Sequence, residues 1–510
     1  MIRTNLDSDY RIGVVGAGTM GRGIAQVAAQ GGFDVVLMDA KAGVADTARD
    51  FIGKMLGRAV EKGRLDAGDR DAALARISLG DDIASLAGCH LVIEAAIENL
   101  EIKQQLFRDL EATCGPDAIL ASNTSALPIA AIGAQCGERG RIAGMHFMNP
   151  VPLMKLVEII HTPLTDPQVT GVLTAIAERM GKTPVQVKDG PAFLVGNCAR
   201  AFYTEALRFT HESIASPAVV DRIVRDAGGF RMGPFEVMDL VGLDVNYPAT
   251  RSLFEDSFHD PRYRPTPEYR LLTEAGMLGR KSGHGFYSYD AEGKPVVEEA
   301  SPPGGSPPGS IWLWAADPAA RERLAGLAEA AGVQIDPGER PAGGTPALVA
   351  PIGEDASSVA ARLGLDPAHT VAVDMLYGWE SHRTVMAPPG ANAASVEAVM
   401  ALLATAGVPV SRINDSPGFI LPRLQAAITN LGCDLCQQGI ATPEDLDRGM
   451  RLGFNFPEGP LAAGDRLGPK TMLRVVEALY GFYCDDRYRP SPWLRRRGML
   501  GLPLTTPDRA

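Results

Sequence analysis

His146 and Glu158 are the residues of this chain whose types and spacing best suit acid–base chemistry. An apolar stretch at 141–147 contains His146, and prolines force a turn before a second apolar stretch at 155–160. If the two stretches pair as strands, residues 146 and 158 are symmetric about Pro152 and face each other. A histidine takes up a proton near neutral pH, and a paired carboxylate holds its tautomer and stabilises the imidazolium. The pair predicts removal of a proton from an alcohol while hydride leaves.

A hydride acceptor must then lie nearby, and the first forty residues predict a dinucleotide site. A strand at 11–15, a helix to residue 30 and a strand at 34–38 ending in Asp39 follow in the order of a βαβ unit. The first turn reads Gly16-Ala17-Gly18-Thr19-Met20-Gly21. Its glycines permit a tight turn and close approach of the backbone to a pyrophosphate, and the helix N-terminus supplies amide donors. Asp39 suits the adenosine ribose and repels a 2′-phosphate, which favours NAD over NADP.

Polar residues follow the expected carboxyl ends of buried strands at 90–97, 118–125 and 141–147. They are Glu98, Lys103, Ser125 and Asn149. Ligands of doubly wound sheets bind beyond these strand ends, so the residues are placed to contact ribose, nicotinamide and substrate. Each one alone is equally consistent with a cap or a solvated loop residue.

Several motifs resemble the 3-hydroxyacyl-CoA dehydrogenase family over about residues 10–290. They are Ser122-Asn-Thr-Ser125, Met145-His146-Phe-Met-Asn149-Pro150-Val-Pro-Leu-Met-Lys155-Leu-Val-Glu158, Gly233-Pro234-Phe235-Glu236-Val-Met-Asp239 and Arg280-Lys281-Ser-Gly-His-Gly-Phe-Tyr287. The resemblance implies that His146 is the base and Glu158 its partner. It also implies that Ser125 binds the 3-oxygen of the substrate, and that Asn149 contacts the cofactor or polarises the carbonyl.

The resemblance further implies NAD as the cofactor, an acyl-CoA as the substrate and no metal. The cofactor contacts that it indicates are Gly16, Gly18, Thr19, Met20, Gly21, Asp39, Ala95, Glu98, Lys103, Ser125, Asn149 and Lys281. For CoA, Lys54, Arg58 and Lys62 share one helix face, which is either a phosphate-binding face or a solvated one. Lys62 matches the family's position best.

One departure lies in the segment that begins at Pro191. The family usually has Pro-Gly-Phe followed by two apolar residues and Asn-Arg, with the asparagine near the catalytic histidine. Here Gly196 holds the asparagine position, and Asn197 comes one residue late. One residue turns a helix by about 100°, so Asn197 does not replace that asparagine without local rearrangement. Weaker binding, altered substrate preference and an inactive site are all consistent with this change.

The second half of the chain repeats part of the first. Matching anchors are Pro191 and Pro417 (417 − 191 = 226), Gly233 and Gly459 (459 − 233 = 226), and Tyr263 and Tyr488 (488 − 263 = 225). A nearly constant offset predicts a duplicated helical domain. We expect a Rossmann-type NAD-binding α/β domain at 1–188, an all-α domain at 189–290, a Pro/Gly linker at 291–310, a degenerate Rossmann-like α/β unit at 311–410 and a second all-α domain at 411–510. The resemblance implies that the two helical copies pair within the chain, and further homo-oligomerisation stays open.

The second α/β unit is expected to be a scaffold without a site of its own. No glycine-rich turn occurs between the linker and residue 370. Strands at 370–375 and 383–386 match the histidine and glutamate strands, with Asp374 or Met375 at the place of His146 and Met386 at the place of Glu158.

Composition excludes several other classes. The formal net charge of −12 argues against nucleic-acid binding, which needs a basic face. The apolar stretches fall short of the roughly 18 residues of a membrane span, and the first ten residues lack the apolar region of a signal peptide. Seven cysteines without metal-site spacing indicate reduced thiols, so we expect a cytoplasmic protein.

Three functional hypotheses follow from these patterns. The first is NAD-dependent oxidation of (S)-3-hydroxyacyl-CoA to 3-oxoacyl-CoA. The duplicated form resembles dehydrogenases of phenylacetate degradation, so 3-hydroxyadipyl-CoA and 3-hydroxybutyryl-CoA are both candidates. A distal carboxylate would require a cation such as Arg200, Arg208 or Arg231. The alternatives are an NAD-binding relative with a structural or regulatory role and a dehydrogenase of a free hydroxy acid.

Overall fold

The computed structural model describes residues 2–7, 9–297 and 304–508, so part of the predicted linker, 298–303, lies outside the described residues. These residues form two compact units, and each is described on its own. The first contains residues 1–197 and 438–454, and the second contains residues 198–437 and 455–510. The boundaries expected at 188, 290, 310 and 410 stay a prediction.

The first unit is a twisted sheet of eight strands in the order β3-β2-β1-β4-β5-β6-β7-β8. The strands are β1 (Arg11–Val15), β2 (Asp34–Met38), β3 (Ile77–Gly80), β4 (Leu91–Glu94), β5 (Ile119–Ser122), β6 (Ile142–Phe147), β7 (Leu156–His161) and β8 (Thr183–Lys188). All neighbours are parallel except β6 and β7. The order reverses direction at β1, which is the switch point of a Rossmann-type fold, where ligands bind beyond the strand ends.

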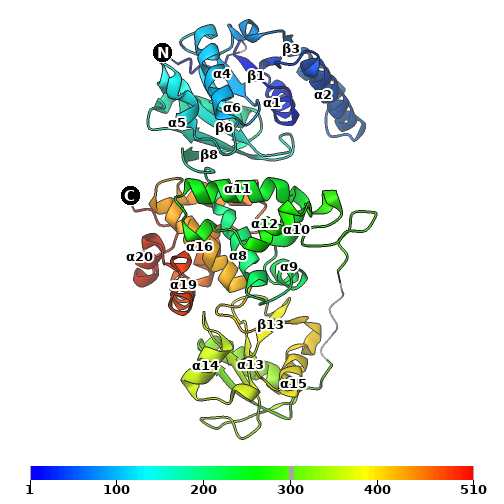
Figure 1. Ribbon diagram of the computed structural model, residues 1–510, viewed down its shortest axis with the longest axis vertical. Helices are drawn as coiled ribbons and strands as arrows, with labels where there is room; N and C mark the ends of the chain where they lie inside the picture. The colour runs from blue at the N-terminus through cyan, green and yellow to red at the C-terminus, as the bar shows by residue number, and fades with distance from the viewer. Residues whose placement is uncertain (1, 8, 298–303, 509–510) are drawn as a thin grey trace. The chain divides into compact units, whose positions relative to one another are not determined.

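Helices connect and cover these strands (Figure 1). They are α1 (Thr19–Gln30), α2 (Val44–Glu61), α3 (Ala67–Ala75), α4 (Leu100–Thr113), α5 (Ile129–Ile132), α6 (Pro167–Arg179), α7 (Val195–Cys198) and, from the second half of the sequence, α17 (Pro443–Gly453). The sheet is built from β-branched residues buried on both faces, as crossover helices require. Apolar residues of α1, α2 and α6 pack with these strands into one core. Asn99 and Asp166 cap α4 and α6 with side-chain hydrogen bonds to backbone amides.

The second compact unit contains both helical copies except α17, which lies in the first unit. The first copy has α8 (Arg200–His211), α9 (Pro217–Asp226), α10 (Pro234–Val241), α11 (Leu243–Asp256) and α12 (Pro267–Glu274). The second has α16 (Leu421–Gln437), α18 (Pro460–Leu467), α19 (Pro469–Tyr483) and α20 (Pro492–Leu500). The duplication predicted from the sequence is therefore present in the structure.

A buried ionic cluster joins the two helical copies. Arg423 of α16 is fully buried, and its Nε donates to Glu205 of α8 at 2.5 Å. Its other nitrogens donate to Glu212 at 3.2 Å and to the hydroxyl of Tyr488 at 2.8 Å. A buried guanidinium is tolerated only when its donors are satisfied, so this cluster fixes how the copies pair. The expected pairing of helical copies within one chain is present.

Two buried aspartates explain the signature motifs of the first helical copy. Asp239 accepts the backbone amides of Phe286 and Tyr287, both at 3.0 Å. Asp221 accepts the amide of Glu236 at 2.8 Å and the hydroxyl of Tyr287 at 2.8 Å. The sequence Gly233–Asp239 is thus tied to the segment 285–289, although about fifty residues separate them in the chain.

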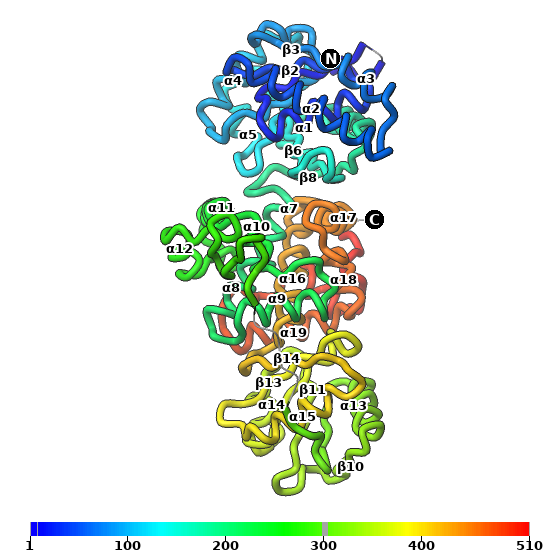
Figure 2. The backbone as a smooth tube through the Cα atoms, turned by 90° about the vertical axis from the view of Figure 1, so that its right-hand side faces the viewer, coloured from blue at the N-terminus to red at the C-terminus, as the bar shows by residue number. Residues whose placement is uncertain are grey.

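The second α/β unit is a six-stranded sheet in the order β10-β9-β11-β12-β13-β14. Figure 2 shows the course of the chain through this unit, with β10, β11, β13 and β14 labelled. The strands are β9 (Ser310–Ala315), β10 (Gln334–Ile335), β11 (Ala347–Ala350), β12 (Thr370–Val373), β13 (Arg383–Met386) and β14 (Val410–Arg412), with α13 (Pro318–Ala330), α14 (Ala356–Leu363) and α15 (Ala393–Leu403) around them. Where the first unit has its glycine turn, β9 runs into Asp317, which caps α13 by accepting the amide of Ala319. An acid at this helix N-terminus repels a pyrophosphate, in agreement with a scaffold.

Strand register corrects one sequence alignment in this unit. Glu158 pairs with Val185 on β8, and Thr384 pairs with Ser411 on β14. The offset is again 226 (411 − 185), so Thr384, and not Met386, holds the place of Glu158. The amide of Asp374 donates to the carbonyl of Thr384 at 2.9 Å, which puts Asp374 at the place of His146. The paired residues are two positions closer in this unit (384 − 374 = 10, against 158 − 146 = 12), so its loop is effectively shorter, and this difference shifted the alignment by two residues.

Asp374 gives a pH-dependent prediction for this unit. Burial raises the pKa of Asp374 to about 7, although the amides of Leu376 and Tyr377 donate to Oδ1. The folded state therefore binds this proton more tightly than the unfolded state does. The contribution of Asp374 to the free energy of unfolding falls as pH rises from about 4 to 7. An amide at this position accepts the same hydrogen bonds without a charge. The quantity to measure is the free energy of unfolding of Asp374→Asn minus that of the wild type, at pH 5 and at pH 8. We expect this difference to be about 2 kcal/mol higher at pH 8. An identical difference at both pH values would contradict this.

Candidate active site

The turn after β1 has the geometry of a pyrophosphate cradle. Gly16 has φ +92°, and a Cβ placed on it would lie 2.6 Å from the carbonyl oxygen of Ala95. A Cβ on Gly21 would lie 1.7 Å from the carbonyl oxygen of Gly16, so only glycine lets the helix pack on the turn. A Cβ on Gly18 would meet nothing within 4 Å. The open space beside Gly18 and the free amides of α1, beginning at Thr19 and Met20, fit the phosphates of a dinucleotide.

Asp39 stands at the carboxyl end of β2, beside this turn. Its Oδ2 accepts the amide of Ala17 at 2.8 Å, and its Oδ1 accepts the amide of Lys41 at 2.9 Å. These two bonds fix the carboxylate next to the glycine turn, where the ribose of a bound dinucleotide would lie. The arrangement therefore fits the NAD predicted from the sequence.

Glu98 and Lys103 belong to one polar cluster after β4. The ammonium of Lys103, which is 1% exposed, lies 2.5 Å from Glu94 and 3.3 Å from Glu98. Glu98 is 41% exposed, and it accepts hydrogen bonds from the Thr124 hydroxyl and from the amide of Ser125, the latter at 3.3 Å. Lys103 thus orients Glu98 at the strand edge, and Glu98 in turn holds the backbone at the exposed Ser125.

His146 and Glu158 face each other across β6 and β7, as the sequence predicted. They are direct partners in the antiparallel register, and His146 Nδ1 lies 2.6 Å from Glu158 Oε2. Glu158 is fully buried and His146 is 15% exposed. A carboxylate only accepts, so Nδ1 carries the proton and Nε2 is left as the basic nitrogen. The ring of Phe193 packs 5.9 Å from the imidazole, centroid to centroid.

A turn between β8 and α7 holds the other oxygen of Glu158. Oε1 accepts the amides of Leu194 at 3.1 Å and Val195 at 2.9 Å. Two amide donors stabilise the charged form of a buried carboxylate. The sequence did not indicate these donors, because backbone amides carry no residue-specific signal.

This turn contains an alanine where the family has glycine. Ala192 has φ +53°, and the related Gly418 of the second copy has φ +76°. A left-handed conformation costs an L-residue roughly 1–2 kcal/mol, whereas glycine adopts it freely. We expect Ala192→Gly to raise the free energy of unfolding by about 0.5–1 kcal/mol after the entropy of the unfolded glycine is subtracted, measured by urea titration. The reverse change, Gly418→Ala, is the matched control and is expected to destabilise. A loss of stability in Ala192→Gly would contradict the argument.

Gly196 and Asn197, the departure seen in the sequence, lie in α7 beside the same turn. A Cβ placed on Gly196 would meet only the Cβ of Ala192, at 3.2 Å. The side-chain amide of Asn197 donates to the carbonyl of Pro191 at 3.2 Å. Asn197 therefore supports the turn from inside, and a side chain at position 196 would crowd Ala192.

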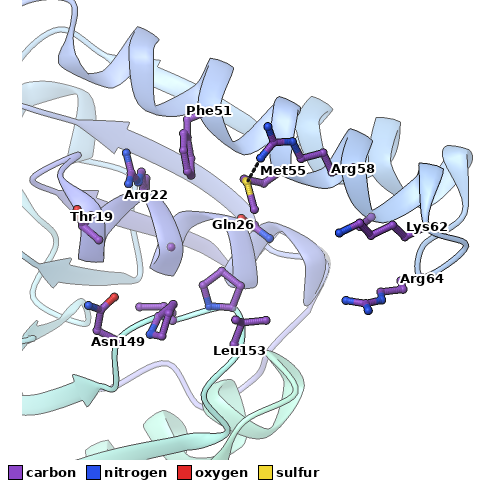
Figure 3. A pocket seen from close by; sticks show the side chains of 15 residues that line it. Thr19, Arg22, Gln26, Phe51, Met55, Arg58, Lys62, Arg64, Asn149 and Leu153 are labelled. Carbon is purple, nitrogen blue, oxygen red and sulfur yellow. Dashed lines mark hydrogen bonds between the residues drawn. The ribbon is translucent and has the colours of Figure 1, made fainter. Parts of the chain in front are cut away.

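A pocket of about 420 Å³ lies between α1, α2 and the loop after β6 (Figure 3). Thr19 and Asn149 stand at one end of the view, and Lys62 and Arg64 stand at the other. The remaining lining residues are Arg22, Gly23, Gln26, Phe51, Met55, Arg58, Ala59, Pro150, Val151, Pro152 and Leu153. Arg58 and Lys62 of the predicted basic face line the pocket and Lys54 does not, while Arg22 and Arg64 were missed by the sequence analysis. The guanidinium of Arg22 lies 3.8 Å from the ring centre of Phe51.

Two buried polar side chains hold the strands and loops of this region. Asn123 accepts the amide of Phe147 at 2.9 Å and so fixes the end of β6. Lys182 is almost fully buried, and its ammonium donates to the carbonyls of Val151 and, at 2.8 Å, Met154. Burial, with the nearby charge of Lys155, lowers the pKa of Lys182 to about 8. Lys182 thus ties down the loop that forms one wall of the pocket.

Lys281 and the three arginines weighed for a distal carboxylate belong to the second unit. Lys281 lies 2.5 Å from Asp244. Arg200 is half-buried and donates to Thr250 at 2.9 Å, and Arg208 pairs with Glu212. Arg231 lines a separate cavity of about 280 Å³ together with Arg225 and Arg280.

Comparisons with known proteins agree with this geometry. The NAD-binding domain of 3-hydroxyacyl-CoA dehydrogenase matches residues 11–190, and the C-terminal domain of the same enzymes matches twice, at 193–289 and 418–503. The chain is 37% identical to the 3-hydroxyadipyl-CoA dehydrogenase of Escherichia coli K12 over 96% of this chain and 97% of that protein. It is 43% identical to a probable 3-hydroxybutyryl-CoA dehydrogenase of Deinococcus radiodurans over 55% of this chain and 100% of that protein.

A solved structure shows the same architecture over the whole chain. The crystal structure of 3-hydroxybutyryl-CoA dehydrogenase from E. coli K12 matches with a TM-score of 0.85 and 36% identity, covering 97% of this chain and 99% of that one. The fold and its duplication are therefore shared with a dehydrogenase of the same length. Among the described residues, no helix is both long and apolar enough to span a membrane.

Proposed function

We propose, since this chain belongs to the 3-hydroxyacyl-CoA dehydrogenase family, that its single reaction centre is the His146–Glu158 pair of the first unit. The protein is an NAD-dependent oxidoreductase that interconverts (S)-3-hydroxyacyl-CoA and 3-oxoacyl-CoA. The observation that carries the proposal is the 2.6 Å contact between Nδ1 of His146 and the buried carboxylate of Glu158. At the related positions of the second α/β unit, Asp374 and Thr384 offer no such pair.

The chemistry follows from the free nitrogen of His146. Nε2 removes the proton of the 3-hydroxyl group, and the imidazolium that forms is stabilised by Glu158 across the Nδ1 hydrogen bond. Bound NAD supplies the acceptor for the hydride that leaves C3. The amides of Leu194 and Val195 hold the carboxylate of Glu158 in place throughout. In the reverse direction the imidazolium returns the proton to the 3-oxygen.

Cofactor and substrate are held by the remaining predicted residues. Gly16, Gly18, Thr19, Met20, Gly21, Asp39, Ala95, Glu98, Lys103, Ser125 and Asn149 are assigned to NAD, with Ser125 and Asn149 also at the 3-oxygen. The role of Lys281, which belongs to the other compact unit, stays a prediction from the sequence. The glycine cradle and the fixed carboxylate of Asp39 support this assignment for the phosphates and the ribose.

The 420 Å³ pocket is assigned to the CoA portion of the substrate. Four cations line it, namely Arg22, Arg58, Lys62 and Arg64, and phosphates are the groups that such a set binds. The apolar surfaces of Phe51 and Met55 suit the adenine ring. Asn149, at the other end of the pocket, follows the strand of His146, so a ligand that fills the pocket extends toward the reaction centre.

The direct test is a steady-state assay with a panel of thioesters. Purified protein is expected to oxidise NADH with acetoacetyl-CoA and with 3-oxoadipyl-CoA, and the ratio of kcat/KM for the two esters reports the preference for a terminal carboxylate. Free acetoacetate and free 3-oxoadipate are the matched controls. The proposal fails if wild-type protein binds NADH yet turns over no ester, or if the free acids serve as well as the esters.

A further inference from the structure

Helix α17 comes from the second helical copy but belongs to the same compact unit as the His146–Glu158 pair. The amide of Lys188 on β8 donates to the carbonyl of Ile440, just before α17, at 2.8 Å. The amide of Gln186 donates to Asp445 on α17 at 3.3 Å. Because β8 is the edge strand of the sheet, these bonds satisfy amides that would otherwise lack a partner strand.

The face that α17 turns toward the sheet contains two glycines beside the buried side chains of Leu446 and Met450. Gly449 and Gly453 are one helical turn apart and share this face. A Cβ on Gly453 would lie 2.6 Å from Leu156 Cδ2 and 3.1 Å from a methyl group of Val195. A Cβ on Gly449 would lie 3.0 Å from Leu194 Cδ2. The helix backbone therefore rests directly on Leu194 and Val195, the two residues whose amides hold Glu158.

The corresponding helix of the first copy lacks this face. Helix α9 begins at Pro217 and α17 at Pro443, an offset of 226 (443 − 217). At that offset Ile223 and Ala227 stand where α17 has glycines. Each helical copy contacts the α/β unit of the other half of the chain. The segment before α17 bonds to β8, and likewise the carbonyl of Ile214, just before α9, accepts the amide of Asn414 after β14 at 2.9 Å. The glycines thus occur only where the helix meets the α/β unit that has the His–Glu pair.

We propose that α17 is a positioning element of the reaction centre. By resting its glycine face on the Leu194–Val195 turn, it sets the position of the two amides on Glu158 and through Glu158 the tautomer of His146. The second half of the chain then acts on the reaction of the first half, although it contributes no group that touches the substrate. This inference rests on the proposed function of the His146–Glu158 pair.

The test is the double variant Gly449→Ala/Gly453→Ala. The two methyl groups push the turn away from Glu158, and we expect kcat to fall about tenfold, since displacements below 1 Å at a reaction centre have effects of this size. The KM for NADH is expected to stay unchanged. The control is Gly326→Ala in α13, a helical glycine whose added Cβ would meet nothing within 4 Å. This control is expected to keep wild-type kcat.

Two further measurements separate positioning from general destabilisation. Val195→Ala removes the two Val195 methyl groups that the added Cβ atoms meet but leaves the contacts with Leu156 and Leu194, so adding it to the double variant is expected to bring kcat part of the way back toward that of Val195→Ala alone. The ¹⁵N chemical shifts of the His146 ring, identified by their loss in His146→Gln, are expected to show one tautomer in the wild type and a mixture in the double variant. This readout holds even if no thioester is turned over, so failure of the proposed function is distinguishable. Unchanged kcat and ring shifts in a folded double variant, or an equal loss of kcat in Gly326→Ala, would overturn the inference.

Discussion

Replacement of His146 by glutamine is expected to lower kcat for NADH-dependent reduction of a 3-oxoacyl-CoA by about 1,000-fold. Glutamine keeps a hydrogen-bonding group beside Glu158, but it neither takes nor returns a proton. The loss is in the chemical step, because His146 lies at the end of β6 and contributes nothing to the glycine cradle. Stopped-flow measurement of a single turnover reports that step directly.

The affinity for NADH serves as the internal control for His146→Gln. A fluorescence titration is expected to give the wild-type dissociation constant, because the turn at Gly16–Gly21 is intact. Residual activity within tenfold of wild type would rule out His146 as the base. Loss of NADH binding would instead indicate that the substitution disturbs the fold.

Replacement of Glu158 by glutamine is expected to lower kcat about 100-fold and to destabilise the protein by about 2 kcal/mol. Glu158 accepts three hydrogen bonds, two from turn amides and one from His146 Nδ1. A glutamine has one acceptor oxygen, and if that oxygen serves the amides, its NH₂ group faces Nδ1 and favours the tautomer with the proton on Nε2. The nitrogen that should remove the substrate proton is then already protonated.

A second buried glutamate provides the control for Glu158→Gln. Glu205 is 1% exposed and lies in the other compact unit, where it binds Arg423. Glu205→Gln is expected to lower the unfolding free energy in urea titration while leaving kcat per folded molecule near wild type. If the two variants lose kcat equally, the effect of Glu158 is one of stability and not of tautomer control.

Local patterns were sufficient for the parts of the fold and site that short segments specify. The glycine turn could be predicted because its spacing reflects local geometry, such as the carbonyl of Gly16 against a Cβ on Gly21 five positions later. The sequence was also enough to predict that His146 and Glu158 face each other, because a single turn joins their strands. The resemblance to a known family then added roles for residues such as Ser125 and Lys281, and those roles remain predictions.

Contacts between segments that are distant in the chain could not be predicted from the sequence. The amides of Leu194 and Val195 reach Glu158 across 36 and 37 positions, and α17 reaches them from more than 240 positions away. Arg22 and Arg64 enter the pocket only because α1 and the end of α2 converge in space. The alignment of Met386 with Glu158 was wrong for a related reason. A difference in loop length between the two copies shows only when the pairing of the strands on either side of the loop is known.

The ionic cluster around Arg423 shows what joining two copies in one gene makes possible. At the offset of 226, the positions related to Arg423 and Glu205 are Asn197 (423 − 226) and Leu431 (205 + 226). In an assembly of identical chains every mutation appears on both sides of the twofold axis, so an ion pair and its symmetry mate are kept or lost together. Here a mutation alters one side alone. The charged pair stands at one place, while a neutral and an apolar residue stand at its mirror position, a difference that two identical chains could not have.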